Sequence, residues 1–216
     1  MSDPLALAIL ISGSGSNLQA IIDAIESGRL NAEIKAVVCN NPQAYGLQRA
    51  AKHDLPTRVI DHRDYADREQ YDTVLQQYLQ SVAPDYIVLA GYMRILSPAF
   101  IDAFEHRILN IHPSLLPAYK GLDTHQRALQ NGEPRHGVSI HVVTAKLDDG
   151  PILLQASYPI DAGDSVEDLQ ARGHDLEHQM YPQLLGWISE GKLRIDVDGR
   201  ILYEQTPLER PLLFNP

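Results

Sequence analysis

The sequence predicts an α/β fold whose first half forms a mainly parallel sheet flanked by helices and whose second half adds antiparallel strands. Short apolar runs alternate with segments of helical periodicity over the first half, which is typical of parallel strands buried on both faces. Loops containing glycine or proline separate these segments. After Gln130, two further strand-like runs flank an Asp-Asp-Gly turn signal, which indicates a hairpin.

The chain begins with a predicted strand, glycine loop and helix. An apolar run occupies Leu5 to Ser12, GSGSN follows at Gly13 to Asn17, and apolar residues then recur with helical spacing. Glycines permit close approach to a ligand, and the unpaired N–H groups of a helix start favour an anion. Leu18 stands where a dinucleotide fingerprint has its third glycine, so the loop suits a single phosphate. Ser16 and Asn17 would donate to it; the alternative is that Ser16 only caps the helix.

The same alternation continues through the rest of the first half. Strands are predicted at 33–39, 57–60 and 85–90, and helices at 45–53, at 65–82 and from Ser97-Pro98 onwards.

A fifth strand is predicted at Arg107 to Ile111, and it overlaps the start of the motif LNIHPSLLP, Leu109 to Pro117. Asn110 and His112 lie two residues apart, so an extended backbone points both side chains to one face. Pro113 ends the ladder directly afterwards. Because open α/β sheets bind ligands at the carboxyl ends of their strands, this pair is a candidate catalytic site. The alternative is that both are ordinary structural residues.

The second half predicts a helix at 123–130, strands at 137–144 and 152–159, and a long helix at 165–190. The connection AKLDDGP, Ala145 to Pro151, is a hairpin turn signal. Two interpretations are open: the connection is only a turn, or it also brings Asp148 back toward His112. Prolines at 207, 211 and 216 predict a tail without regular helix or strand. The chain therefore reads as one domain, 1–216, with a parallel half at about 1–105 and a second half at about 106–216.

Bulk composition excludes several classes of protein. The net charge of -10, from 28 acidic and 18 basic residues, opposes nucleic acid. No apolar run reaches the ~20 residues that a membrane span requires. No basic residue precedes the first apolar stretch, which argues against a signal peptide. The single Cys39 fits a reducing cytoplasm. His174 and His178 lie one helical turn apart, but HDLEH lacks the zinc-protease order, so we expect no metal.

Several motifs together resemble the phosphoribosylglycinamide formyltransferase family of folate-dependent enzymes, over about residues 7 to 190. They are ISGSGSNLQAII, LAGYMRILSP, LNIHPSLLP, GVSIHVVTAKLDDGPILLQ and LEHQMYP. The resemblance implies a Rossmann-like single domain that transfers the formyl group of 10-formyltetrahydrofolate, a co-substrate, to the amine of glycinamide ribonucleotide. It also implies a cytoplasmic monomer or homodimer with small-molecule partners, no metal, no nucleic acid and no membrane.

The resemblance assigns expected roles to individual positions. Asn110, His112 and Asp148 match the catalytic trio, and Gly15, Ser16 and Asn17 match the phosphate loop. Folate contacts fall on Arg68, Met93, Arg94, Ile95, Leu96, Asn110, Thr144, Ala145, Lys146, Leu147 and Asp148. The nucleotide-binding segment is His174, Asp175, Leu176 and Glu177. Position 123, where the family often carries a histidine, is Asp123 here.

The expected chemistry is direct transfer through a tetrahedral intermediate. The Asn110 amide and a protonated His112 would stabilise the oxyanion, which is worth roughly 3 kcal/mol per donor. We expect Asp148 to raise the pKa of His112 and so favour the imidazolium. His112 would then help to protonate the departing folate nitrogen.

Three alternatives to this function remain. Formyltetrahydrofolate hydrolase and the transferase acting on initiator methionyl-tRNA share the trio, but each carries a further domain for which this chain has no room, and the negative charge disfavours tRNA. The third alternative is a nucleotide-binding module without catalysis, which would use only the glycine loop and leave Asn110 and His112 dispensable.

Overall fold

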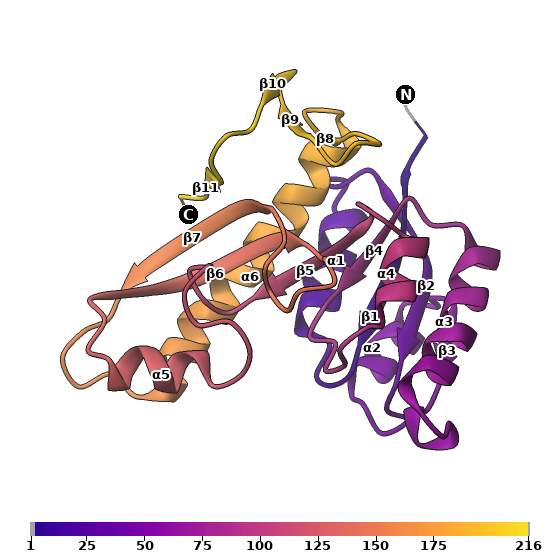
Figure 1. The fold of residues 1–216 in the computed structure, drawn as a ribbon, viewed down its shortest axis with the longest axis horizontal. Coiled ribbons are helices and arrows are strands. Elements are labelled where there is room, and N and C mark those ends of the chain that lie inside the picture. Colours follow the sequence, from indigo (N-terminus) through magenta and orange to yellow (C-terminus); the bar gives the residue numbers. More distant parts are fainter. Residues whose placement is uncertain (1–2, 216) are drawn as a thin grey trace.

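The computed structural model describes residues 3–215, and its centre is an eight-stranded sheet with strand order β11-β7-β6-β5-β4-β1-β2-β3 (Figure 1). The first five strands run parallel to one another, whereas β6 is antiparallel to both β5 and β7. The predicted fold class is therefore confirmed. The strands are β1 Leu5–Ile11, β2 Ala32–Cys39, β3 Thr57–Val59, β4 Tyr86–Leu89, β5 Ile108–His112, β6 Arg135–Val142, β7 Ile152–Pro159 and β11 Leu212–Leu213.

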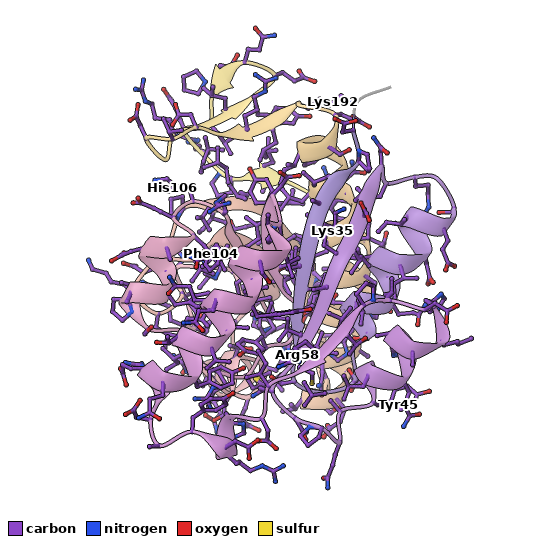
Figure 2. All side chains as sticks on the ribbon, turned by 90° about the vertical axis from the view of Figure 1, so that its right-hand side faces the viewer. Lys35, Tyr45, Arg58, Phe104, His106 and Lys192 are labelled. Carbon is purple, nitrogen blue, oxygen red and sulfur yellow. The ribbon has the colours of Figure 1, made fainter. Side chains whose placement is uncertain are left out.

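Helices cover both faces of the sheet (Figure 2). They are α1 Ser16–Glu26, α2 Gly46–Lys52, α3 Arg68–Val82, α4 Pro98–Ala103, α5 Thr124–Gln130 and α6 Val166–Ser189, with a 3-10 turn at His62–Asp64. The side chains of β1 alternate between two cores. Leu7 and Ile9 pack with α1 and α6 on one face, whereas Ala8 and Leu10 pack with α3 and α4 on the other. This explains why the predicted strands read as continuous apolar runs.

The strand order reverses beside β1. The chain passes from β1 to β2 and β3 on one side and then returns to β4 on the other. Loops leaving the carboxyl ends of two such strands diverge and open a crevice. The N–H of Met93, after β4, donates to the Ser12 hydroxyl, after β1, at 2.8 Å. The hydroxyl of Tyr181 in α6 donates to the carbonyls of Leu89 and Leu109, which ties that helix to β4 and β5.

The prediction of an irregular tail is wrong. Three short strands form a separate antiparallel sheet: β8 Leu193–Ile195, β9 Ile201–Tyr203 and β10 Thr206–Pro207. Pro207 is tolerated because β10 is an edge strand, where a missing N–H breaks no inner ladder. The chain then adds β11 beside β7, directly after Pro211. Pro216 lies outside the described residues.

Of the helices in the described part of the chain, none combines the length and apolar character that a membrane span requires.

Candidate active site

A cleft of about 1130 Å³ opens along the carboxyl ends of β1, β4 and β5. Its walls are the glycine loop, the segment after β4, the end of β5, residues 121–126, residues 143–148 and one face of α6. The predicted site residues that line it are Gly15, Ser16, Asn17, Met93, Arg94, Ile95, Leu96, Asn110, His112, Thr144, Ala145, Lys146, Leu147, Asp148, His174 and Glu177. The cleft therefore brings together distant segments, such as Asn17 and Glu177, which are 160 residues apart in sequence.

Three predicted site residues, Arg68, Asp175 and Leu176, are not part of the cleft lining. Arg68 begins α3 and forms an exposed ion pair with Glu69. On α6, residues three apart share a face, which explains why His174 and Glu177 line the cleft. The residues between them point elsewhere, so Asp175 is exposed and Leu176 packs in the core.

The glycine loop presents the amino end of α1 to the cleft. Gly15 caps this helix with φ 69°, and a Cβ there would lie 2.7 Å from the Cα of Gly46, so both conformation and space require glycine. Ser16 is already the first residue of α1, and no side chain caps the helix. The alternative that Ser16 only caps the helix is therefore wrong. Its hydroxyl does not cap α1, and no side chain caps the first N–H groups of this helix, where an anion is favoured.

Asn17 joins this loop to α6. Its amide donates to the Oε2 atom of Glu177 at 2.8 Å, and both side chains are buried. Burial raises the pKa of Glu177, although the Asn17 donor and the nearby His174 act in the opposite direction. The asparagine of the loop therefore fixes a carboxyl group on the opposite wall of the cleft.

The expected catalytic trio converges at the other end of the cleft. The Nδ1 atom of His112 lies 3.5 Å from the Oδ2 atom of Asp148, and the His112 Nε2–H donates to the carbonyl of Tyr119 at 2.9 Å. Asn110 lines the same wall, two residues earlier on β5. The predicted convergence of Asn110, His112 and Asp148 on one spot is thus present.

His141 completes this cluster, and sequence reasoning missed it. It lies directly across from Asn110 on β6, its Nε2 atom is 3.1 Å from Asn110 Nδ2, and it is 3.6 Å from Asp148 Oδ1. Its Nδ1–H donates to the Val142 carbonyl at 2.9 Å, so Nε2 accepts from Asn110. The sequence signal was the alternation in VSIHVVT, which puts Ser139 and His141 on one face. Only the strand register places that face beside Asn110.

Asp148 raises the pKa of His112 as expected, but the net shift is downward, so the expected protonated resting form of His112 is wrong. Burial lowers this pKa and outweighs the Tyr119 carbonyl and the Asp148 charge, both of which raise it. Asp148 therefore acts in the expected direction, but the burial of the imidazole decides the net shift. The lowered pKa favours the neutral imidazole of His112.

The loop that carries Asp148 holds this carboxylate in place. Asp148 adopts φ 47°, an uncommon left-handed conformation for a residue with a side chain. Its Oδ2 atom accepts from the Gly121 N–H at 2.9 Å, and the adjacent Asp149 pairs with Lys120. Burial alone would raise the pKa of Asp148, but the contacts with His141, Gly121 and His112 lower it overall. Asp148 is consequently a charged group within reach of both imidazoles.

The expected folate wall carries exposed apolar side chains beside an arginine. Met93 is 72% exposed and Ile95 61%, and Leu147 faces the same cleft from the loop of Asp148. The Arg94 guanidinium lies 4.7 Å from the centre of the Tyr71 ring, and its Nε atom is buried without a hydrogen-bond partner. Apolar groups next to one cation favour a flat ligand with an anionic end.

Within residues 3–215, no group of three or more His, Cys, Asp or Glu side chains is arranged to hold a metal ion. The rings of His174 and His178 stack with their centres 6.1 Å apart.

Comparison with known proteins identifies the family. A family model described as formyl transferase matches residues 5–185. The phosphoribosylglycinamide formyltransferase of Escherichia coli is 48% identical over 189 residues, which are 88% of this chain and 89% of that protein. The chain belongs to the phosphoribosylglycinamide formyltransferase family.

Further members of this family agree. The Haemophilus influenzae phosphoribosylglycinamide formyltransferase is 46% identical and covers 91% of this chain and 95% of that protein. The solved structure of the Coxiella burnetii phosphoribosylglycinamide formyltransferase in complex with CHES superposes with a TM-score of 0.92 at 46% identity, over 98% of this chain and all of that chain. The resemblance drawn from the motifs is confirmed. The family model ends at residue 185, before the small sheet of β8, β9 and β10.

Proposed function

We propose that this chain transfers the formyl group of 10-formyltetrahydrofolate to the amine of glycinamide ribonucleotide, as an enzyme of purine synthesis. One observation carries the proposal. A single cleft joins the start of α1, which suits a phosphate, to the half-buried amide of Asn110, the buried imidazole of His112 and the half-buried carboxylate of Asp148, beside an apolar wall. A phosphorylated amine and a flat formyl donor would meet at that cluster.

The nucleotide occupies the end of the cleft built by Gly15, Ser16 and Asn17. Its phosphate is bound by the N–H groups at the start of α1, where the helix dipole favours negative charge. Glu177 accepts from donor groups of the sugar or the glycinamide, because Asn17 already holds the carboxyl in place. His174, one turn earlier on the same face of α6, adds a polar group to this end.

The folate occupies the wall formed by 93–96 and 144–148. Its flat ring packs on the apolar side chains there, and Arg94 offers a cation to an anionic group of the donor. Arg68 is exposed outside this wall, and only a long ligand tail would meet it.

The reaction needs neither a metal nor a covalent enzyme intermediate. The neutral amine attacks the formyl carbon, a C–N bond forms, and the carbonyl oxygen becomes an oxyanion. One N–H of Asn110 is held by His141, and its second N–H is free to donate to the oxyanion. The carbon then releases the folate nitrogen, which receives the proton lost by the amine.

His112 assists this proton transfer as a neutral imidazole. Its Nε2–H donates to the Tyr119 carbonyl, so Nδ1, beside Asp148, takes up the proton from the amine and returns it for the folate nitrogen. The lowered pKa of His112 favours the neutral resting form, and Asp148 stabilises the imidazolium when it forms. The products are tetrahydrofolate and formylglycinamide ribonucleotide.

The proposal extends to the organisation of the chain. Residues 1–216 would act as one formyltransferase domain, with the nucleotide loop in the parallel half at about 1–105 and the catalytic and folate residues in the half at about 106–216. The enzyme would work in the cytoplasm as a monomer or homodimer on these two small molecules.

A spectrophotometric assay tests the proposal. The chain is mixed with a 10-formyl folate analogue, with and without glycinamide ribonucleotide, and the appearance of deformylated folate is followed. We expect release only when the nucleotide is present. Release without the nucleotide would identify a hydrolase, and no release in either mixture would leave only the binding module.

A further inference from the structure

His125, at the second position of α5, lies on the wall of the cleft and belongs to none of the groups assigned above. Its ring packs against α6 at a point without a side chain, since a Cβ added at Gly173 would lie 3.5 Å from the Cε1 atom of His125. The imidazole is therefore held between two helices and reaches the nucleotide cleft.

His136 on β6 fixes the orientation of that ring. The Nε2 atom of His136 lies 3.0 Å from the Nδ1 atom of His125, and the two rings meet edge to face with centres 5.0 Å apart. His136 is only 1% exposed, enclosed by Tyr119 and Tyr158. A second hydrogen bond joins His136 to the backbone carbonyl of Pro113.

These contacts determine which nitrogen of each ring carries the proton. A carbonyl oxygen only accepts hydrogen bonds, so His136 is the donor in its bond to Pro113. The Nε2 atom of His136 faces His125, so the nitrogen that donates to Pro113 is Nδ1. Burial lowers the pKa of His136, and a neutral imidazole has one donor and one acceptor. The Nε2 atom of His136 is then the acceptor, which makes Nδ1 of His125 the donor and leaves Nε2 of His125 with a lone pair.

His125 also stays neutral. Burial and the nearby His136, His174 and His112 lower its pKa to about 4. Among the described residues, the Nε2 atom of His125 has no hydrogen-bond partner. It is absent from the buried unpaired polar atoms of this part of the chain, so it is open to the cleft. The ring thus offers one free acceptor to the cleft.

We propose that the Nε2 atom of His125 accepts a hydrogen bond from a ribose hydroxyl of the nucleotide substrate. The position of His125 in the cleft points to the sugar of the nucleotide. Its neighbours are His112, near the reacting amine, and His174, near the phosphate end, and the ribose lies between the amine and the phosphate of the substrate. The inference rests on the proposed function. It makes His125 a binding residue that His136 positions.

Two substitutions of His125 test its role in binding the ribose, because each replaces only one of the two ring nitrogens with an atom in a similar position. In His125→Asn, the amide nitrogen replaces Nδ1 and keeps the bond to His136, but no atom replaces Nε2. We expect the KM for glycinamide ribonucleotide to rise about three- to tenfold, the value of one neutral hydrogen bond, with kcat and the folate KM unchanged. His125→Gln restores an oxygen near Nε2 and should recover part of the loss.

His53→Asn is the matched control, because His53 pairs with Glu26 and Gln19 away from the cleft, and it should leave every constant unchanged. An unchanged nucleotide KM in His125→Asn would overturn the inference while normal transfer by the parent enzyme leaves the proposed function standing. Absence of nucleotide-dependent transfer in the parent enzyme would instead overturn the proposed function.

A second measurement does not depend on a folded variant. Nitrogen-15 NMR of the histidine rings in the parent enzyme should find His125 with the proton on Nδ1, and the Nε2 signal should move when glycinamide ribonucleotide is added. A proton on Nε2 instead, or an Nε2 signal that stays in place at saturating nucleotide, would overturn the inference.

Discussion

The two ends of the cleft are built by different means. The phosphate end takes its shape from one continuous segment, Gly13 to Asn17, and presents backbone N–H groups. The catalytic end combines side chains from β5, from β6 and from the loop after β6, and no two of its main groups are adjacent in sequence. A continuous motif can be recognised in the sequence, whereas an assembled cluster depends on strand register.

Electrostatics also differ between the ends. At the phosphate end, burial keeps Glu177 closer to its neutral form. At the catalytic end, burial lowers the pKa of His112, and contacts with both imidazoles and Gly121 lower the pKa of Asp148, whose Oδ2 atom lies 3.5 Å from His112 Nδ1. These pKa shifts support the proposed roles, in which the first end binds an anion and the second stabilises a proton that arrives during the reaction.

The largest expected effect is at the catalytic end. His112→Ala removes the group that exchanges the proton, and kcat should fall by about 10²- to 10⁴-fold. Nucleotide binding, measured by isothermal titration calorimetry, should stay close to that of the parent enzyme because the phosphate end is untouched. Turnover near the parental rate would refute the role assigned to His112.

Asp148→Asn separates charge from shape at the same end. Without the carboxylate, only the Tyr119 carbonyl opposes the effect of burial, so the pKa of His112 should fall further. We expect a smaller loss of kcat than in His112→Ala, about 10²-fold. NMR titration of the His112 ring measures the shift directly, and an unaltered pKa would mean that the two groups are not coupled.

The double change Ser16→Ala with Asn17→Ala tests the phosphate end. Loss of the Ser16 donor to a charged phosphate, together with release of Glu177 from its Asn17 donor, should raise the KM of the nucleotide about 10- to 100-fold and leave the folate KM unchanged. Steady-state kinetics with each substrate varied in turn provides the measurement. Equal effects on both substrates would place the phosphate elsewhere in the cleft.

The smallest effect concerns stability, and its dependence on pH has opposite signs at the two ends. Glu177 has a raised pKa, so its contribution is fully present below the ordinary glutamate pKa and is lost as pH rises through the folded value. His112, with a lowered pKa, contributes stability that is present above about pH 6.5 and is lost as pH falls.

Glu177→Gln should therefore raise the free energy of unfolding more at pH 7 than near pH 4. Urea unfolding at the two pH values makes the comparison. A gain that is equal at both pH values would show that ionisation of Glu177 is not its source.

Local pattern was enough to predict much of the molecule. The apolar runs identified the parallel strands, GSGSN identified the helix start, and the two-residue spacing of Asn110 and His112 placed both on one wall of the cleft. Each of these features depends on neighbours within a few residues. The motifs also identified the family before any contact was known.

Contacts between distant segments could not be predicted in this way. The pairing of Asn110 with His141 follows from the register of β5 and β6, and the bond from Asn17 to Glu177 joins residues 160 positions apart. The tail forms β10 and β11 despite its prolines because an edge strand tolerates a missing N–H.

The sequence by itself determined the strands and helices of the main sheet, the glycine loop, and most of the side chains that line the cleft. Only the tertiary structure decided their protonation, because burial is a sum over every element packed around a group. For His112 that sum outweighed the one neighbour, Asp148, whose effect the sequence could anticipate.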